Sequence, residues 1–250
     1  AINSFPKKLT LSINNKNLIP GQDFIIKASA VSTSGSFKCK YLPLSEEDRK
    51  SDLSSIFLVG NSSTKEFLKD NIFEAKGFIY LEEKQPVWSV YDGRDTSSYI
   101  VFKINKNAFS DSIRSINTHV YNDFLASHET RNVWAQVKGS KYPDSILIIG
   151  AHFDHLGMMG DVLYPGANDN ASGTAMLLEL ARHFSQKENQ TECTLVFAAF
   201  SGEEAGLMGS RFMARHFPYD LKKVKLMLNL DMVATGSEGI TVVNAKAFPK

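Results

Sequence analysis

Residues 146–154 read Ile-Leu-Ile-Ile-Gly-Ala-His-Phe-Asp, an apolar run that stops at a histidine and an aspartate. Two later runs stop in a similar way: residues 194–200 are followed by Ser-Gly-Glu-Glu, and residues 224–230 by an aspartate. Nearly continuous apolar runs are typical of central strands whose two faces are both covered by helices. Ligands of such sheets bind beyond the carboxyl ends of the strands. The sequence therefore predicts that three strands bring a histidine and several carboxylates to one edge of a sheet.

Strands alternate with helices throughout the second half of the chain. We expect strands at 116–124, 132–137, 146–151, 194–200, 224–230 and 240–243, and helices at about 172–185 and 205–216. Such alternation is typical of α/β folds. Residues 111–250 are therefore predicted to form an α/β domain whose mixed β-sheet is sandwiched by helices.

The first half of the chain carries no comparable concentration of polar residues at strand ends. Residues 1–20 are predicted to be a lead-in segment, a short strand or hairpin that turns at Asn14 and Asn15. Residues 21–110 follow the order strand, helix, strand, with the helix at 64–75, and are predicted to form a smaller, β-rich domain. We find no nucleophile–base pair or ligand cluster there, and His119 and His128 just beyond it are isolated.

The His-Phe-Asp sequence at 152–154 has a chemical interpretation and a structural one. His152 is a candidate metal ligand through one ring nitrogen, with Asp154 orienting the ring from behind. Alternatively, the two side chains are an ordinary hydrogen-bonded pair at the protein surface. The motif alone does not decide between these interpretations.

A tight loop, Pro-Gly-Ala-Asn-Asp-Asn-Ala-Ser-Gly, occupies residues 165–173 and opens the next helix. Asp169, Asn170 and Ser172 are all good helix-capping residues, so a structural role for one of them is expected. Asp169 has a second possible role, because a bridging carboxylate can hold two cations about 3.5 to 4 Å apart.

Glu203 and Glu204 follow the strand at 194–200 and precede a helix. Acidic residues at a helix start usually interact favourably with the helix dipole. Two adjacent carboxylates also suit two separate roles, since one can bind a cation while the other takes a proton as a general base.

Four blocks of sequence, AHFDH, PGANDNASG, SGEEAGLMGS and LNLDM, together resemble the bacterial leucyl aminopeptidase family of zinc exopeptidases. This family is related to glutamate carboxypeptidase II, glutaminyl cyclase and the transferrin receptor. The resemblance spans about residues 130–235. It implies that His152, Asp169 and Asp231 bind one zinc ion and that Asp169 and Glu204 bind a second. It also implies that Glu203 is the base that takes a proton from the attacking water and passes it to the leaving amine.

The resemblance carries two further expectations. Residues 21–110 are similar to the protease-associated domain that this family often contains, which does no chemistry itself. The family's second zinc ion takes a histidine from well downstream of the Asp231 position, and no histidine follows Asp231 here. We therefore expect the native protein to continue beyond Lys250 and the second zinc site to be incomplete in this chain. His155 and His216 are the candidates that could substitute.

Composition limits the partners. The chain has 250 residues and a net charge of +1, so no basic surface for nucleic acid or an anionic membrane is indicated, and no apolar run is long enough for a membrane helix. Its two cysteines, Cys39 and Cys193, lie far apart without zinc or redox spacing and are interpreted as buried thiols rather than a disulfide.

The near-neutral charge fits a small, near-neutral substrate, and the family resemblance implies that this substrate is a peptide. An aminopeptidase is favoured over a carboxypeptidase on the family's bacterial members. A glutaminyl cyclase and a non-catalytic receptor or scaffold on the same fold remain the alternatives. Family habit suggests export to the periplasm or the medium, and the oligomeric state is not indicated.

Overall fold

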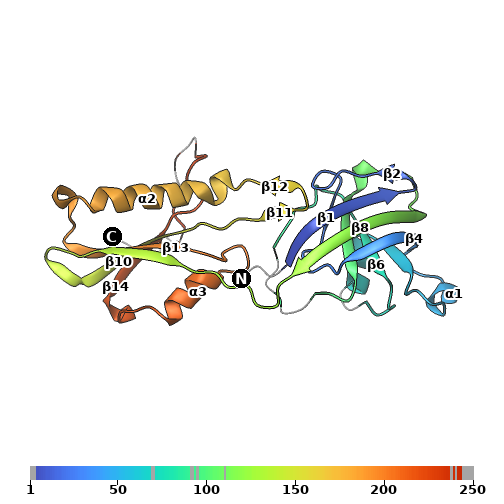
Figure 1. Cartoon of the computed structure of the whole chain (residues 1–250), viewed down its shortest axis with the longest axis horizontal. Coiled ribbons are helices and arrows are strands. Elements are labelled where there is room, and N and C mark those ends of the chain that lie inside the picture. Colours follow the sequence, from blue (N-terminus) through green and yellow to red (C-terminus); the bar gives the residue numbers. More distant parts are fainter. Residues whose placement is uncertain are drawn as a thin grey trace. The chain divides into compact units, whose positions relative to one another are not determined.

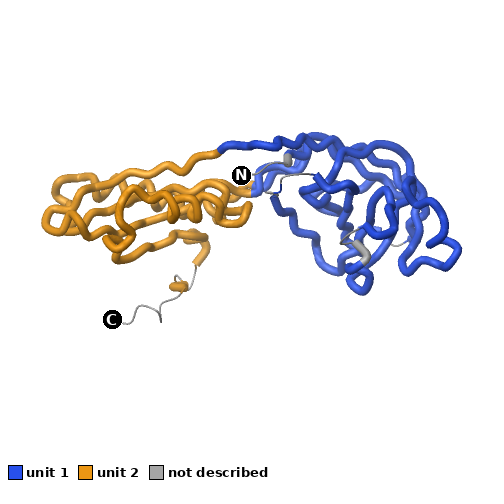
Figure 2. Tube along the Cα trace, turned by 90° about the horizontal axis from the view of Figure 1, so that it is seen from below, with its two compact units in different colours: residues 1–129, 156–164 blue, residues 130–155, 165–250 orange. Residues whose placement is uncertain are grey.

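The structure is a computed structural model that describes residues 4–68, 71–90, 93, 96–109, 111–236, 239 and 241–243. The chain divides into two compact units (Figure 2): unit 1 comprises residues 1–129 and 156–164, and unit 2 comprises residues 130–155 and 165–250. Within the described ranges, no helix has the length and apolar character needed to cross a membrane.

Unit 1 is built on an eight-stranded sheet with the order β2-β1-β8-β4-β5-β6-β7-β3. The strands are β1 (Ser4–Ile13), β2 (Lys16–Asn17), β3 (Phe24–Ile26), β4 (Thr33–Tyr41), β5 (Ile56–Gly60), β6 (Gly77–Glu82), β7 (Ile100–Asn105) and β8 (Ser115–Phe124). Short helical segments connect them, namely α1 (Glu46–Arg49), η1 (Ser62–Leu68) and η2 (Lys106–Ala108). The expected hairpin is present, because β1 and β2 pair antiparallel around Asn14 and Asn15, both with positive φ.

The core of unit 1 is rich in aromatic side chains. Phe57 on β5 is fully buried, and its ring lies 5.2 Å from that of Phe37 and 6.0 Å from that of Phe102, centroid to centroid. A hairpin of β11 (Gly157–Met159) and β12 (Val162–Tyr164) also packs into this core through the fully buried Met159. A segment that follows His155 in the sequence is therefore part of unit 1.

The boundary between the two units does not lie at residue 110, where the sequence predicts a domain boundary. Strand β8, expected in the α/β domain, instead pairs antiparallel with β1 and with β4 of unit 1. Its alternate side chains, Ile116, Thr118, Val120 and Asn122, are buried, whereas those between them are more exposed. This alternation predicts a strand with one buried face but does not identify the sheet to which the strand belongs. Unit 1 is consequently larger than the domain expected at 21–110.

The prediction of a helix at 64–75 is wrong for residues 71–75, which are not helical. A 3₁₀ helix, η1, begins next to Asn61, whose side chain accepts a hydrogen bond from the Ser63 N–H (3.0 Å). Residues 69 and 70 lie outside the described residues. At Asn71 the backbone φ is positive, and the side chain bonds both the N–H and the C=O of Ala75 (2.9 Å each). These side-chain bonds replace those that a helix would make.

Unit 2 contains a four-stranded sheet with the order β14-β10-β13-β9. The strands are β9 (Val133–Val137), β10 (Tyr142–His152), β13 (Cys193–Phe200) and β14 (Val224–Asn229). The helices are α2 (Gly173–Phe184) and α3 (Met208–Arg215), and the short helical segments are η3 (Ala167–Ser172) before α2, η4 (Lys187–Asn189) after α2 and η5 (Leu221–Lys223) after α3. β10 runs parallel to β13 and β14, and β9 is antiparallel to β13.

The two faces of this sheet bury alternate residues of the central strands. Ile146 and Ile148 of β10 pack with Met213 of α3, whereas Ala151 packs with Leu177 of α2. The helices accordingly cover opposite faces (Figure 1). This two-sided burial explains the continuous apolar runs of β10 and β13. The prediction of a mixed sheet sandwiched by helices is confirmed.

Two smaller expectations concern the chain end and the cysteines. The strand expected at 240–243 falls partly on residue 240, outside the described residues, and residues 241–243 do not form a strand. Cys39 and Cys193 are free thiols, half-buried rather than fully buried. Burial raises the pKa of the Cys39 thiol to about 12, so this thiol is unreactive at neutral pH.

Candidate metal centre

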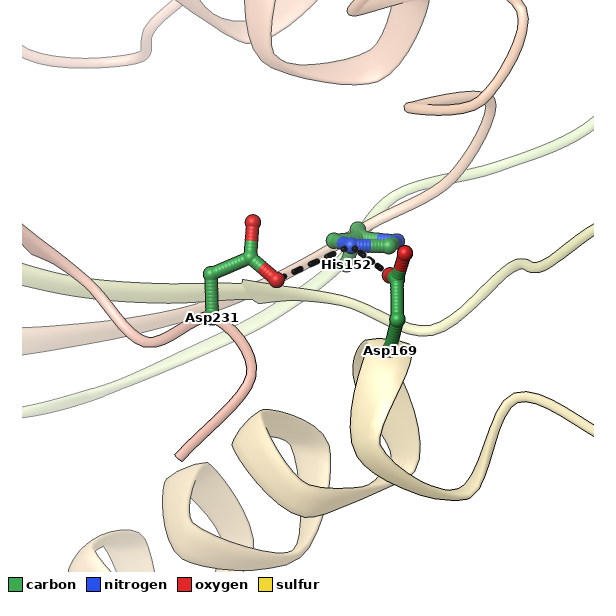
Figure 3. A group of neighbouring side chains, drawn as sticks. All are labelled: His152, Asp169 and Asp231. Atoms are coloured by element: carbon green, nitrogen blue, oxygen red, sulfur yellow. Dashed lines mark ion pairs between the residues drawn. The ribbon is translucent and has the colours of Figure 1, made fainter. Parts of the chain in front are cut away.

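His152, the last residue of β10, lies at the centre of the candidate site. It is 2% exposed, and its Nε2 atom lies 3.2 Å from Asp169 Oδ1 and 3.5 Å from Asp231 Oδ1 (Figure 3). Asp169 comes from η3, and Asp231 follows β14. The structure thus brings together three predicted ligands that are up to 79 positions apart in the sequence.

The orientation of the His152 ring is fixed from behind. Its Nδ1 atom lies 3.0 Å from the backbone oxygen of Asp154. A carbonyl oxygen can only accept a hydrogen bond, so Nδ1 donates, and the neutral ring keeps its lone pair on Nε2. The hydroxyl of Thr174 at the start of α2 donates to the backbone oxygen of His152 (2.8 Å). The Nε2 atom of His152 therefore faces the two aspartates and is the ring nitrogen placed to bind a metal ion.

Asp154 acts on the site in a way that differs from the expected contact. Its carboxylate is 3.8 Å from His152 Nδ1, so the backbone oxygen rather than the side chain makes the close contact. The carboxylate instead accepts hydrogen bonds from the backbone N–H groups of Glu203 (3.1 Å) and Glu204 (3.3 Å). Asp154 therefore joins the end of β10 to the turn that carries both glutamates.

The loop before α2 is bound to the segment that carries Asp231. The Nδ2 atom of the buried Asn170 donates to the backbone oxygen of Leu230 (2.9 Å), and its Oδ1 accepts from the N–H groups of Gly173 (3.0 Å) and Met232 (3.2 Å). Leu230 and Met232 flank Asp231. Asn170 thus fixes the distance between Asp231 and its neighbour in the loop, Asp169.

Glu203 and Glu204 lie close to these ligands in a partly desolvated environment. Burial is the main cause that raises the pKa of Glu203, and the neighbouring carboxylates of Glu204 and Asp231 raise it further. Burial, followed by the charge of Asp169, raises the pKa of Glu204. Because buried carboxylates repel one another, this arrangement favours either protonation or a bound cation.

A second group of candidate ligands consists of His155, Asp169 and Glu204. One potential ligand atom from each lies within 4.8 Å of the others, and Asp169 also belongs to the first group. The other histidine considered as a substitute lies elsewhere: His216 Nδ1 bonds the Phe212 backbone oxygen (3.0 Å), and its ring stacks on that of Phe212. The structure therefore brings His155, and not His216, to the predicted second position.

The donor set fits zinc. Imidazole nitrogens and carboxylate oxygens are common zinc ligands, and catalytic zinc sites keep three protein ligands and one open position. Two groups of three such side chains that share Asp169 match this requirement. The fit is also supported by two buried atoms, His155 Nδ1 and Glu204 Oε1, that lack a hydrogen-bond partner.

A family comparison agrees with this geometry. Residues 132–249 match the model of peptidase family M28. The M28 match includes every residue of the two ligand groups as well as Asp154 and Glu203. It covers just under half of the chain and none of the residues before 132.

Curated relatives and solved structures extend the M28 comparison. A probable zinc metalloprotease of Pyricularia oryzae is 42% identical over 115 residues, which are 43% of this chain and 22% of that protein. One of Pyrenophora teres f. teres is 42% identical over 106 residues, 40% of this chain and 22% of that protein. The matched part therefore spans about a fifth of the length of these relatives.

The fold of the whole chain is similar to that of bacterial enzymes. A zinc aminopeptidase from Bacillus subtilis matches with a TM-score of 0.64 and 22% identity, over 95% of this chain and 60% of that chain. A peptidase M28 precursor from Shewanella amazonensis matches with a TM-score of 0.60 and 18% identity, over 91% and 59%. At these identities the likeness establishes the fold.

Sequence reasoning underestimated one residue of the site. Asn170 was considered only as a helix cap, yet it is buried and bonds the backbone on both sides of Asp231. A signal was available, because three polar residues in a row within the loop are more than one helix start requires.

Proposed function

We propose that this chain carries the catalytic centre of a zinc-dependent exopeptidase that acts as an aminopeptidase. The observation that carries the proposal is the convergence of His152 Nε2 on Asp169 and Asp231, with a partly buried glutamate, Glu203, beside them. The M28 match over the same residues supports it. Two zinc ions that share Asp169 are proposed, one for each ligand group.

Zinc bound here would supply Lewis acidity and lower the pKa of a coordinated water. The proposed role of Glu203 is to take the proton of the attacking water and deliver it to the leaving amine. Its raised pKa suits this role, because a general base works best when its pKa lies closer to the working pH. Asp154 holds Glu203 in place through the backbone N–H, and Asp169 and Glu204 are proposed to bind the second ion.

A hollow beside this base has the size of a single-residue site. It measures about 180 Å³, and its lining residues are His152, Phe200, Glu203, Leu207, Ser210, Met227 and Asn229. Sites for drug-sized ligands occupy about 300 to 1,000 Å³. The smaller, mostly apolar hollow suits one apolar side chain of a peptide and supports exopeptidase rather than endopeptidase action.

The experiment that tests this function compares Glu203→Gln with the unaltered protein. Glu188→Gln, a change at an exposed residue of η4, is the matched control. Aminoacyl anilides, amino-blocked peptides and carboxyl-blocked peptides are assayed with and without a chelator. We expect chelator-sensitive release of amino-terminal residues and a decrease in turnover of about 10²- to 10⁴-fold for Glu203→Gln, with an unchanged zinc content.

Three outcomes would contradict the proposal. Wild-type turnover in Glu203→Gln would exclude the role given to that residue. Cyclisation of amino-terminal glutamine with release of ammonia, and no cleavage of anilides, would indicate a glutaminyl cyclase. Absence of bound zinc would indicate a scaffold on the same fold. Location outside the cytoplasm, in the periplasm or the medium, stays a proposal from the family resemblance.

A further inference from the structure

The turn that carries Glu203 is closed by hydrogen bonds within itself. The Met208 N–H donates to the backbone oxygen of Gly202 (2.9 Å), and the Gly206 N–H donates to the backbone oxygen of Glu203 (2.8 Å). Residues 202–208 are called the Glu203 turn below. Because the turn is held together internally, the place of the Glu203 side chain depends on how the turn is attached to the elements around it.

Asn132, directly before β9, is bonded to the chain on both sides of the Glu203 turn. Its Oδ1 atom accepts a hydrogen bond from the N–H of Ser201 (3.1 Å), the residue after β13. Its Nδ2 atom donates to the backbone oxygen of Gly209 (2.8 Å), in the first turn of α3. A carboxamide can make both bonds because it carries an acceptor and two donors. One side chain therefore joins the strand and the helix that flank the Glu203 turn.

The start of α3 lies directly against the end of β13 and against Asn132. Gly209 is buried, and a Cβ atom built there would overlap the backbone oxygen of Ser201 and the Oδ1 atom of Asn132. Glycine at 209 thus allows the close approach that lets Asn132 reach both segments. Asp154 holds the middle of the turn, since it accepts from the N–H of Glu203 (3.1 Å). The Glu203 turn is therefore fixed in its middle by Asp154 and at its two ends by Asn132.

We propose that Asn132 is a positioning residue for Glu203. It holds the Glu203 turn between β13 and α3 and thereby fixes the place from which the Glu203 carboxylate meets the attacking water. This inference rests on the proposed function and extends it to a residue of a fourth strand segment, away from the strand ends that carry the ligands. A displacement of about 1 Å at the reacting groups can lower a rate by about 10²-fold, so such an anchor acts directly on turnover.

The test compares the steady-state kinetics of Asn132→Ala with those of the unaltered protein on an aminoacyl anilide. Assays at saturating zinc exclude loss of an ion as the cause of a lower rate. We expect kcat to fall by about 10²-fold and KM to change much less. Asn132→Asp keeps the acceptor for the Ser201 N–H but loses the donor to Gly209, so its kcat should lie between the two.

A double-mutant cycle separates positioning of Glu203 from a general loss of stability. In a Glu203→Gln background, Asn132→Ala should lower the remaining turnover only slightly, because the base on which Asn132 acts is absent. Equal falls in both backgrounds would overturn the proposal. Thr130→Val is the matched control: Thr130 shares a hydrogen bond with the Ser201 hydroxyl, so the variant removes a contact with the same residue but leaves the backbone of the turn attached. Its kcat should stay near that of the unaltered protein.

Amide hydrogen exchange reads the anchor without any activity. The amides of residues 202–208 should exchange faster in Asn132→Ala, whereas those of β10 should keep their protection. Gly209→Ala should reproduce this local change by pushing α3 away from Ser201. Unchanged exchange in the turn together with an unchanged kcat would overturn the proposal, as would exchange that rises equally throughout unit 2.

The failures of the two proposals are distinguishable. An unaltered protein that binds no zinc and cleaves no peptide contradicts the proposed function. A protein that cleaves anilides, and does so equally well in Asn132→Ala, contradicts only the role of Asn132.

Discussion

The two units place their polar side chains in opposite ways. In unit 1, Asn14 at the hairpin turn donates to the Ser112 backbone oxygen (2.8 Å) and accepts from the Arg114 N–H (3.0 Å). In unit 2, His155 Nδ1 and Glu204 Oε1 are buried 2.7 Å apart, next to the carboxylate of Asp169. The bonds of Asn14 hold the fold of unit 1 together, whereas His155 and Glu204 belong to a group of candidate metal ligands.

This contrast separates residues that stabilise the fold from residues that bind a ligand. Within the described residues, both groups of three or more potential metal ligands belong to unit 2. The raised pKa values of Glu203 and Glu204 belong to the same unit and arise mainly from burial. Clustered carboxylates, a buried histidine and raised pKa values of two glutamates coincide at one end of the sheet, as is common at functional sites.

The largest predicted effect is a loss of stability in unit 1 that leaves the candidate metal centre of unit 2 unchanged. Phe57→Ala removes a fully buried ring between Phe37 and Phe102 and should lower the free energy of unfolding by about 3 to 5 kcal/mol. Trp88 is buried in this core and Trp134 lies on β9 of unit 2, so their fluorescence reports the two units separately in denaturant titrations.

Zinc affinity is the control measurement for Phe57→Ala. The ligands all lie in unit 2, so we expect the affinity to stay unchanged while the Trp88 transition moves to lower denaturant. A loss of zinc affinity equal to that of a ligand variant would show that the two units are energetically coupled, and the separation drawn above would be wrong.

The next prediction concerns Asn170, whose replacement should lower both the stability of unit 2 and its affinity for zinc. Asn170→Ala removes two hydrogen bonds that join the Asp169 loop to Leu230 and Met232 and a third, to Gly173, within the loop. Unpairing these buried groups should cost about 1 to 3 kcal/mol. Because the variant also releases Asp231 from Asp169, zinc affinity should fall by about 10- to 100-fold.

Asn168→Ala is the matched comparison for Asn170→Ala. Asn168 lies in the same loop and bonds Thr235 and the Ala234 N–H, but these contacts are exposed. Its replacement should change stability and zinc affinity much less. Equal losses in the two variants would mean that the loop as a whole, rather than the buried amide, positions Asp231.

The convergence of His152 and Asp231 could be predicted from the sequence because the signal of each residue is local. A strand that ends in a polar residue at 152 or 231 can be recognised without its neighbours, and parallel strands bring such ends to one edge. The fold of unit 2 could be predicted for the same reason: residues such as Ile148 and Phe197 belong to runs that are apolar on both faces.

Other features of the fold could not be predicted because they depend on contacts with residues that are distant in the sequence or on local side-chain bonds. Strand β8 was recognised as a strand, but its pairing with β1 joins residues more than 100 positions apart, such as Leu9 and Val120. The non-helical backbone at 71–75 accompanies the local bonds of Asn71 to Ala75, which compete with the helix that the apolar pattern favours. The role of Asn170 depends on a segment 60 residues away.

The smallest predicted effect is a change in the stability of unit 2 with pH. It tests whether burial destabilises the ionised form of Glu204 in the metal-free protein. Burial raises the pKa of Glu204 in the folded protein, so the folded form holds its proton more strongly than the unfolded chain does. Its contribution to stability is then complete below the unfolded pKa of about 4.3 and is lost as the pH rises through the higher folded value. In the presence of a chelator, unit 2 should therefore lose stability as the pH increases above about 4.3, and Glu204→Gln should reduce this dependence.

Glu179 on α2 should affect the pH dependence of stability with the opposite sign. Its hydrogen bond to Arg182 lowers the pKa of the Glu179 carboxyl, so its contribution to stability is lost as the pH falls. Denaturant unfolding followed by Trp134 fluorescence from pH 4 to 8 measures this dependence in the unaltered protein and in Glu204→Gln. Saturating zinc should remove the Glu204 dependence at neutral pH, since a bound cation favours the ionised carboxylate. If Glu204→Gln leaves the pH dependence of unfolding unaltered, burial does not destabilise the ionised form of Glu204 in the metal-free protein.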